Sequence, residues 1–494
     1  MLYQRTLMGV SLIAAMAAVP VLAQEPLSEG WLGSETLQTP YGEFEFKNGY
    51  PVGDSAERLL DLELRNRAVE VYLTNMMAVS QKAVDEGLRA FGASKPNQVV
   101  IWEQLMDPAT VLLTANTETV YALGTLDLKA DGPTVVEAPA KMLGFLQDGL
   151  QRYLQDIGPL GPDKGAGGKF LVLPPDHGGD VPDGYFVVKS PTYSVMFAMR
   201  GFQVDNKTDE AVALMKQTRV YPLSTAAAPP PMQFMNGSNQ KISTLFPDNF
   251  HYFELLAKLV EDEPLDSFGP LERAQMQSIG IQKGKPFAPD ARLKALLSES
   301  ARLGGAIARA QTYAYREKDP YYYAGKKWQG IPSGLTYTFA IDGAPQIDAK
   351  VNVYYMAAGN SPAMMAKNIG QGSQYLWTYR DAEGNYLDGA KSYALHIPPN
   401  IPAKAFWSVL VYDALSRSQL QTSQHLPSVS SYSSPVVNPD GSIDIAFGPE
   451  KPTNAGNWIK TVPGKGWFGM FRWYSPTEPF FDKSWQLEDI KPSK

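Results

Sequence analysis

The sequence has no cysteine among its 494 residues. This absence excludes disulfide bonds, thiolate metal sites, a cysteine nucleophile and a lipid anchor on cysteine, so stability must come from core packing. Histidine is scarce too, because only His177, His251, His396 and His425 occur, far apart and without an i, i+4 pair. This spacing argues against a zinc or iron site built from histidines.

Motifs for phosphate binding and for serine nucleophiles are missing as well. The glycine-rich segment GPDKGAGGKF (161–170) has Asp163 where a phosphate-binding loop begins with glycine, and Phe170 where Ser or Thr follows the lysine. No G-x-S-x-G elbow occurs, which argues against serine hydrolysis. The loop 174–184 contains three aspartates, as a calcium-binding loop can, but their spacing is not that of an EF-hand and Asp, Gly and Pro together are typical of turns. A turn is the preferred interpretation, and a cation bound by oxygen ligands is the alternative. The sequence therefore predicts no cofactor.

Long apolar runs and basic clusters are absent from most of the chain. The net charge is −7 and no basic cluster indicates a nucleic-acid partner. One apolar run, 7–19, follows Arg5 and precedes Ala23, which is the pattern of a secretory signal peptide over residues 1–23. Its removal takes away Arg5 and changes the net charge from −7 to −8. No later run approaches the roughly 20 residues of a membrane helix. We therefore expect a periplasmic or secreted protein without an integral membrane segment.

The hydrophobic content and the length of the sequence indicate a globular chain of several domains. Hydrophobic residues make up 44% of the sequence, and this length usually corresponds to two or three domains. Residues 54–90 carry apolar side chains at helix spacing, which predicts one long helix beginning near Asp54. Residues 96–222 contain short apolar runs separated by Gly and Pro, which favour an antiparallel β-sandwich.

The predicted secondary structure changes twice in the second half of the chain. The composition of STAAAPPPMQ (224–233) is typical of a linker, and residues 240–318 are predicted to be helical. From about 335 onward strand patterns return and continue to the end. One of them is KVNVYYMAA (350–358), interpreted as a strand in which Asn352 and Tyr354 share a face.

Three long segments resemble a known pair of families. They are TANTETVYALGTLDL (114–128), YLDGAKSYALHIPPNIPAKAFWSVLVYD (386–413) and the segment 438–490, beginning NPDGSIDIAFGPEKP. They resemble the bacterial domains of unknown function 1254 and 1214, in that order and over nearly the whole mature chain. The resemblance implies no agreed activity. It also differs at Glu118, where the family usually has aspartate.

The resemblance and the residue patterns together predict a mainly β chain with helical parts. The resemblance implies an N-terminal immunoglobulin-like β-sandwich, a small all-helical domain that contains IGIQKGKPF (279–287), and a C-terminal jelly-roll β-sandwich. The predicted boundaries are a signal peptide (1–23), a polar lead and N-terminal helix (24–95), the immunoglobulin-like sandwich (96–223), a linker and helical domain (224–325), and the jelly-roll domain (326–494).

The segment AFWSVLVYD (405–413) is predicted to be a central strand covered on both faces. Period-2 alternation places Trp407, Val409, Val411 and Asp413 on one face, and the residues between them are also mostly apolar. A strand with two apolar faces is typical of the middle of a sheet that packs on both sides.

Arg472 lies in the strand pattern GWFGMFRWY (466–474) and is a cation among mostly apolar residues. Burying it is costly unless it is paired. Asp413, Glu118 or a bound anionic ligand could supply the countercharge. The preferred interpretation is a structural Asp413–Arg472 pair that joins two strands, and the alternative is a pair that faces a ligand.

The segment TANTETVY (114–121) places polar residues in a predicted strand. Alternation puts Asn116 and Glu118 on one face and Tyr121 on the other. A carboxamide beside a carboxylate could bind a polyol or act as an acid/base group. The alternative is a hydrogen-bond network at a strand edge or between domains.

Tryptophan is concentrated in the C-terminal third, where seven of the nine occur: Trp328, Trp377, Trp407, Trp458, Trp467, Trp473 and Trp485. Aromatic rings stack on sugars and apolar ligands. The preferred interpretation is nevertheless an aromatic core.

Two functional hypotheses follow. The first is an exported enzyme acting on a small polar or carbohydrate-like substrate at the junction of the two β domains, with Glu118 and Asp413 as catalytic carboxylates. Its predicted ligand-binding residues are Asn116, Tyr121, Trp407, Arg472 and Tyr474. The alternative is a non-catalytic envelope protein that binds a glycan or a partner protein through its aromatic-rich β module.

Overall fold

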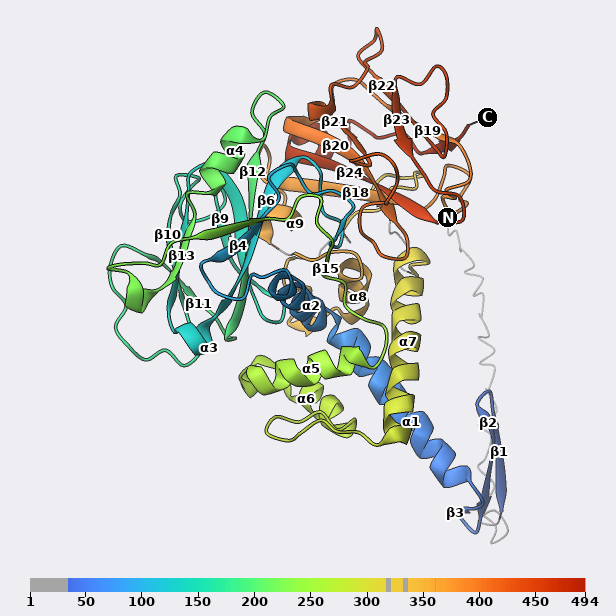
Figure 1. Cartoon of the computed structure of the whole chain (residues 1–494). Helices are drawn as coiled ribbons and strands as arrows, with labels where there is room; N and C mark the ends of the chain where they lie inside the picture. Colours follow the sequence, from blue (N-terminus) through green and yellow to red (C-terminus); the bar gives the residue numbers. More distant parts are fainter. Residues whose placement is uncertain (1–33, 317–320, 332–335, 360, 494) are drawn as a thin grey trace, which may run out of the picture. The chain divides into compact units, whose positions relative to one another are not determined.

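The computed structural model describes residues 34–316, 321–331, 336–359 and 361–493 (Figure 1). The signal peptide predicted over residues 1–23 lies outside the described residues. The chain divides into two compact units, of which the first ends at Glu63 and the second begins at Leu64. In the first unit three strands form an antiparallel sheet: β1 (Glu35–Thr39), β2 (Gly42–Lys47) and β3 (Tyr50–Pro51).

The long helix predicted over 54–90 is two helices. The first, α1 (Ser55–Thr74), ends one residue before Asn75, and α2 (Met76–Ala90) begins one residue after it. Asn75 Nδ2 donates a hydrogen bond to the Val71 carbonyl oxygen at 3.0 Å. An asparagine side chain that bonds to the backbone competes with regular helix geometry, which accounts for the break.

The helical prediction over 240–318 holds for three helices, α5 (His251–Asp262), α6 (Pro270–Ser278) and α7 (Ala291–Tyr313), but not for its start, where Ile242–Ser243 is a strand; residues 317 and 318 lie outside the described residues. Figure 1 shows the three helices grouped together, with α2 and α8 between them and the β-sheets. The other helices are short: α3 (Leu128–Asp131), α4 (Asp209–Met215), α8 (Ile347–Tyr354), α9 (Pro362–Met365) and α10 (Glu478–Phe481). Within the described ranges, none of the helices combines the length and hydropathy that crossing a membrane requires.

The first β region consists of a six-stranded sheet in the order β14-β4-β6-β12-β8-β9 and a four-stranded sheet in the order β11-β10-β7-β13. Its strands are β4 (Gln98–Ile101), β6 (Thr119–Asp127), β7 (Thr134–Ala138), β8 (Met142–Asp148), β9 (Tyr153–Ile157), β10 (Gly168–Leu173), β11 (Phe186–Lys189), β12 (Ser194–Phe202), β13 (Arg219–Pro222) and β14 (Gln233–Asn236). Val120 and Phe197 of the larger sheet share one buried cluster with Val136 and Val172 of the smaller sheet. Each sheet thus buries its apolar face against the other.

The second β region consists of two four-stranded sheets, in the orders β18-β24-β20-β21 and β23-β22-β19-β25. Its strands are β18 (Ser373–Thr378), β19 (Tyr393–Ile397), β20 (Ala403–Asp413), β21 (Ser428–Ser430), β22 (Ile443–Gly448), β23 (Asn457–Lys460), β24 (Trp467–Pro476) and β25 (Lys491–Pro492). Two further pairs are β5 (Thr110–Val111) with β15 (Ile242–Ser243), and β16 (Ala340–Ile341) with β17 (Ala344–Pro345). The chain is therefore a mixed α/β protein with several β-sheets.

The prediction that β20 is covered on both faces is confirmed. Val409 and Val411 belong to the cluster between the two sheets of the second β region. Leu410 and Tyr412, on the opposite face, belong to the cluster that includes the helices α5, α7 and α8. The sheet that contains β20 and β24 is thus packed against a sheet on one face and against helices on the other.

The strand predicted over 350–358 is wrong, because Ile347–Tyr354 forms α8. Alternating valines favour a strand when one face is exposed. Here Val351, Asn352, Val353 and Tyr354 are all buried in the helix, which packs against α7 and α2. Burial on nearly every side removes the periodicity that distinguishes the two structures. Asn352 and Tyr354 therefore do not share a face, because residues two apart lie on different sides of a helix.

Candidate functional site

Two β-strands place buried arginines at one cavity. Arg200 lies on β12 of the first β region and is 6% exposed, and Arg472 lies on β24 of the second and is 3% exposed. Both line an internal cavity of about 100 Å³. Strand alternation determines which way the Arg200 side chain points. Arg200 lies on the same face of β12 as Met196 and Ala198, and this face is turned away from the partner sheet.

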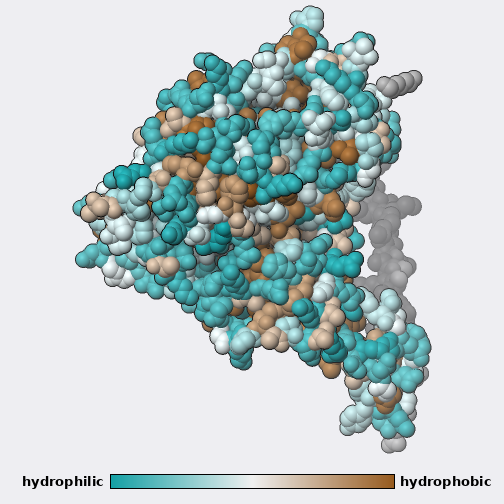
Figure 2. All heavy atoms as spheres, in the orientation of Figure 1, coloured by the Kyte–Doolittle hydropathy of each residue, from teal (hydrophilic) through white to brown (hydrophobic). Residues whose placement is uncertain are grey.

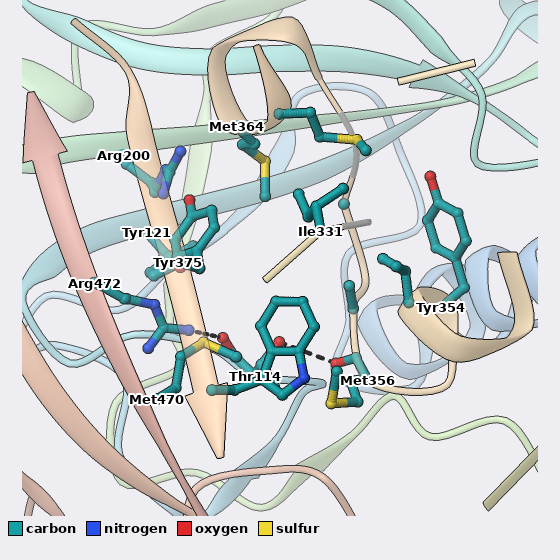
Figure 3. A pocket seen from close by; sticks show the side chains of 15 residues that line it. Thr114, Tyr121, Arg200, Ile331, Tyr354, Met356, Met364, Tyr375, Met470 and Arg472 are labelled. Carbon is teal, nitrogen blue, oxygen red and sulfur yellow. Dashed lines mark hydrogen bonds between the residues drawn. The ribbon is translucent and has the colours of Figure 1, made fainter. Parts of the chain in front are cut away.

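Each arginine has a tyrosine directly opposite on the neighbouring strand. Arg200 pairs in register with Tyr121 on β6, and Arg472 with Tyr375 on β18. Tyr375 also acts electrostatically on Arg200 and helps to raise its pKa, while the Tyr375 ring centroid lies 5.6 Å from the Arg472 guanidinium carbon. Tyr375 therefore links the two cations. Figure 3 shows both arginines at the same side of the cavity as Tyr121 and Tyr375.

Arg472 also joins the two β regions. Its guanidinium donates hydrogen bonds to the Thr114 carbonyl oxygen and to the Tyr412 hydroxyl. The Tyr412 hydroxyl in turn donates to the Ala115 carbonyl oxygen at 2.7 Å. Burial raises the pKa of Tyr412 although the Arg472 charge opposes this, so the phenol is neutral at pH 7 and supplies no countercharge.

Neither guanidinium forms an ion pair with a carboxylate of the described residues. The nearby carboxyls act only through longer-range electrostatics. Burial raises the pKa of Glu118, opposed by a Thr117 hydrogen bond and by the charge of Arg472. Burial also raises the pKa of Asp156 to about 6, opposed in part by Arg200. Burial thus opposes the ionisation of both carboxyls, and neither lies within ion-pair distance of Arg200 or Arg472.

The rest of the cavity is apolar. Its described lining includes Ile331, Val353, Met356, Met364, Met365, Trp377 and Met470. In Figure 3, Tyr354 and Met356 lie toward the side away from the arginines. No Asp, Glu or His is present among the described residues that line it. The cavity therefore combines a cationic end with a methionine-rich, adaptable apolar end.

The interpretation of Asn116 and Glu118 as neighbours on one strand face is wrong. The strand β6 begins at Thr119, and the residues before it form a bend. Asn116 Oδ1 accepts hydrogen bonds from the backbone amides of Glu118 and Thr119, each at 3.0 Å. An asparagine that bonds the backbone ahead of it is typical of a turn.

The predicted residues of this segment nevertheless lie near the arginines. Asn116 Nδ2 donates to the Tyr474 hydroxyl at 2.7 Å, and the Tyr474 ring centroid lies 6.0 Å from the guanidinium carbon of Arg200. Tyr121 lines the cavity, as Arg472 does. Glu118 is buried behind this layer and does not line the cavity.

The predicted Asp413–Arg472 pair does not form. In the β20–β24 register Asp413 is opposite Trp467, whereas Arg472 is opposite Ser408. Five residues of strand separate these positions by about 17 Å. The Asp413 carboxylate instead pairs with Lys465 and accepts hydrogen bonds from the backbone amides of Leu415 (2.7 Å) and Ser416 (3.0 Å). It stabilises the turn after β20 and lies outside the arginine cavity.

We expect Asp413→Asn to lower stability only where the carboxylate is charged. Burial opposes its ionisation, but the hydrogen bonds from Lys465, Ser416 and Leu415 outweigh burial and hold its pKa below the ordinary value. Such a group contributes stability above the unfolded pKa of about 3.9, and the contribution disappears as the pH falls through the folded pKa. Urea unfolding should show a loss of about 1 kcal/mol at pH 7 that vanishes toward pH 3.

A matched control is Asp388→Asn, since Asp388 caps one backbone amide, that of Ala390 at 2.9 Å, and pairs with no lysine of the described residues. Its effect should be smaller and should not depend on Lys465. A loss for Asp413→Asn that is the same at pH 7 and pH 3 would contradict the charge-based account.

The tryptophans form core and not a surface. Of the seven in the C-terminal third, only Trp458 is not buried. Trp407 belongs to the cluster between the two sheets and stacks on Phe471 with a centroid distance of 5.6 Å, so it does not reach the arginine cavity. The face in Figure 2 is mainly hydrophilic with scattered hydrophobic residues. A glycan partner stays a prediction without an exposed tryptophan strip to support it.

In the described part of the chain, no three His, Asp or Glu side chains gather closely enough to hold a metal ion. The cavity itself offers cationic donors and sulfur atoms, which do not suit a hard cation.

Comparison with known proteins identifies both β regions. Residues 96–222 match the family "Protein of unknown function (DUF1254)", and residues 372–478 match "Protein of unknown function (DUF1214)". The chain carries a DUF1254 region followed by a DUF1214 region. The resemblance stated from the sequence is thereby confirmed. Thr114, Tyr121 and Arg200 belong to the DUF1254 region, and Tyr375, Met470 and Arg472 to the DUF1214 region.

One solved structure agrees at the level of fold. The VPA0106 protein from Vibrio parahaemolyticus matches with a TM-score of 0.51 and 19% identity, covering 87% of this chain and 100% of that one. A putative uncharacterised protein from Burkholderia cenocepacia matches with a TM-score of 0.40 and 11% identity, covering 88% of this chain and 95% of that one. A search of curated proteins gives no match.

Proposed function

We propose that the protein binds a small organic anion in the cavity between its DUF1254 and DUF1214 regions. The observation that carries this proposal is the pair of buried arginines, one from each region, that face one cavity without a carboxylate partner among the described residues. A buried cation without a countercharge is costly, and a bound anion removes that cost.

The arginines keep donors for such a ligand. A guanidinium has five N–H donors in a planar fork that matches a carboxylate. Arg472 uses donors for the Thr114 carbonyl oxygen and the Tyr412 hydroxyl. The remaining donors can form charge-assisted hydrogen bonds, which are stronger than neutral ones.

The lining favours an organic anion over a sugar and favours binding over catalysis. Apart from the arginines, Thr114 and the tyrosines, the described lining offers few groups for the hydroxyls of a polyol. The acid–base pair suggested by the sequence is not assembled either, because Glu118 lies behind the lining and Asp413 lies about 17 Å along the strand from the Arg472 position.

The test is thermal unfolding of the chain with matched acids and amides. At constant ionic strength, benzoate and hexanoate should raise Tm, whereas benzamide and hexanamide should not. A ligand at 100 times its Kd stabilises the folded state by about 2.7 kcal/mol, which corresponds to a shift of a few degrees. Equal shifts for acid and amide, or a shift with monosaccharides alone, would overturn the proposal.

The proposal also includes the architecture of the two β regions and the location of the protein. We interpret the paired sheets of the DUF1254 and DUF1214 regions as the immunoglobulin-like sandwich and the jelly roll that the sequence resemblance implies; the shared clusters of each sheet pair support this. We also place the binding outside the cytoplasm, on the strength of the signal-peptide pattern in residues 1–23.

A further inference from the structure

A second internal cavity adjoins the arginine cavity. It has a volume of about 90 Å³. The two cavities have six lining residues in common: Thr114, Tyr121, Arg200, Ala357, Gly359 and Met364. The Arg200 side chain therefore stands where they meet, with Arg472 on the side of the first cavity only.

The second cavity has fewer polar residues in its described lining than the first. Beyond the shared residues its lining is entirely hydrophobic and includes Val84, Leu112, Leu123, Phe145, Met196 and Ala198. Among the described residues that surround it, Arg200 is the one charged group. The hydrophobic part of this lining suits hydrocarbon, because it offers water few hydrogen-bond partners.

One face of the strand β12 lines both cavities. Met196, Ala198 and Arg200 project from the same face at intervals of two residues. Four residues of strand span about 13 Å, so this face runs from an apolar position to a cationic one. The neighbouring strand β6 repeats the order, since Tyr121 is opposite Arg200 and Leu123 is opposite Ala198.

We infer that the ligand is an amphipathic carboxylate, with its head between Arg200 and Arg472 and a short hydrocarbon tail along β12 in the second cavity. This inference rests on the proposed function. An apolar cavity of 150 Å³ accommodates a benzene-sized ligand. Two adjoining cavities of about 100 and 90 Å³ therefore suit a chain of roughly six to eight carbons.

The experiment is calorimetric titration of the chain with acetate, butyrate, hexanoate, octanoate and dodecanoate. Burial of each added methylene should tighten binding by up to about fourfold. We expect affinity to rise to hexanoate or octanoate and to fall for dodecanoate, which exceeds the space. Affinity that does not change with chain length would overturn the inference.

Two substitutions in the second cavity should shift the preferred length in opposite directions. Ala198→Leu fills the space and should move the optimum to a shorter chain, whereas Met196→Ala enlarges it and should move the optimum to a longer chain. Ala394→Leu, at an exposed position of β19, is the control and should leave the series unchanged.

The outcomes separate the two proposals. If carboxylates of every length bind equally and binding requires Arg200, the tail site is wrong and the anion site stands. If no carboxylate binds in an Arg200-dependent way, the proposed function fails and the inference fails with it. If Ala198→Leu and Met196→Ala both leave the optimum unchanged, the tail does not lie along β12.

Discussion

Replacement of Arg200 by methionine should abolish the thermal shift produced by benzoate and hexanoate. The substitution removes one of the two cations at the cavity but keeps an unbranched side chain that fills the space. Arg200 has no close carboxylate partner, and replacing a buried charge by a well-packed hydrophobe is often neutral or stabilising. We therefore expect the ligand-free protein to change in stability by less than about 1 kcal/mol.

The control is Arg219→Met, at an exposed position on β13 of the same region. It removes a cation of the same type and should leave both the ligand-free stability and the thermal shift unchanged. If Arg200→Met still shows the full shift with benzoate, Arg200 does not hold the anion. If Arg219→Met loses the shift as well, the effect comes from net charge and not from the cavity.

Replacement of Arg472 by methionine should instead destabilise the ligand-free protein by about 3 kcal/mol. Its guanidinium satisfies the Thr114 carbonyl oxygen and the Tyr412 hydroxyl, both at the contact between the DUF1254 and DUF1214 regions. Removing a buried partner leaves those groups without their hydrogen bonds, which costs more than the bonds contribute net. Chemical denaturation measures the loss, and carboxylate binding should weaken in the same variant.

Arg380→Met provides the comparison within the DUF1214 region. Arg380 donates a hydrogen bond to the Gly384 carbonyl oxygen at 2.8 Å and stacks on Tyr386 at 4.0 Å, but it lies in a turn and is only half-buried. Its loss should cost less than about 1 kcal/mol. Equal losses for Arg380→Met and Arg472→Met would contradict the linking role given to Arg472.

The strand faces could be predicted from the sequence because alternation is a local property. Period-2 alternation alone places Trp407 and Val409 on one face of the strand and Leu410 and Tyr412 on the other. In the structure the first pair belongs to one buried cluster and the second pair to another. The same pattern identified Arg472 as a buried cation. Its partner could not be identified, because strand register depends on pairing between distant segments.

The register also explains the failure of the Asp413 prediction. Asp413 and Arg472 point to opposite faces of the sheet and lie five pairs apart. Lys465, which does pair with Asp413, comes from the turn before β24 and carries no sequence signal that distinguishes it.

Arg200 was missed although the signal that found Arg472 applies to it. In SVMFAMRGF (194–202) it is a lone cation in an apolar strand, on the face of Met196 and Ala198. A systematic search for single charges inside strand patterns would have found both arginines. Their convergence on one cavity, and the part of Tyr375 between them, required the packing of the DUF1254 and DUF1214 regions against each other.

The most direct measurement of the central claim is a crystal structure with 4-bromobenzoate, located by anomalous scattering from bromine. The two adjoining cavities of about 100 and 90 Å³ together provide space for the ring of 4-bromobenzoate, since a cavity of 150 Å³ accommodates benzene. The account predicts a bromine peak inside the cavity, with the carboxylate within hydrogen-bond distance of Arg200 and Arg472. Bromine found only at the surface, or a carboxylate directed away from both arginines, would contradict it.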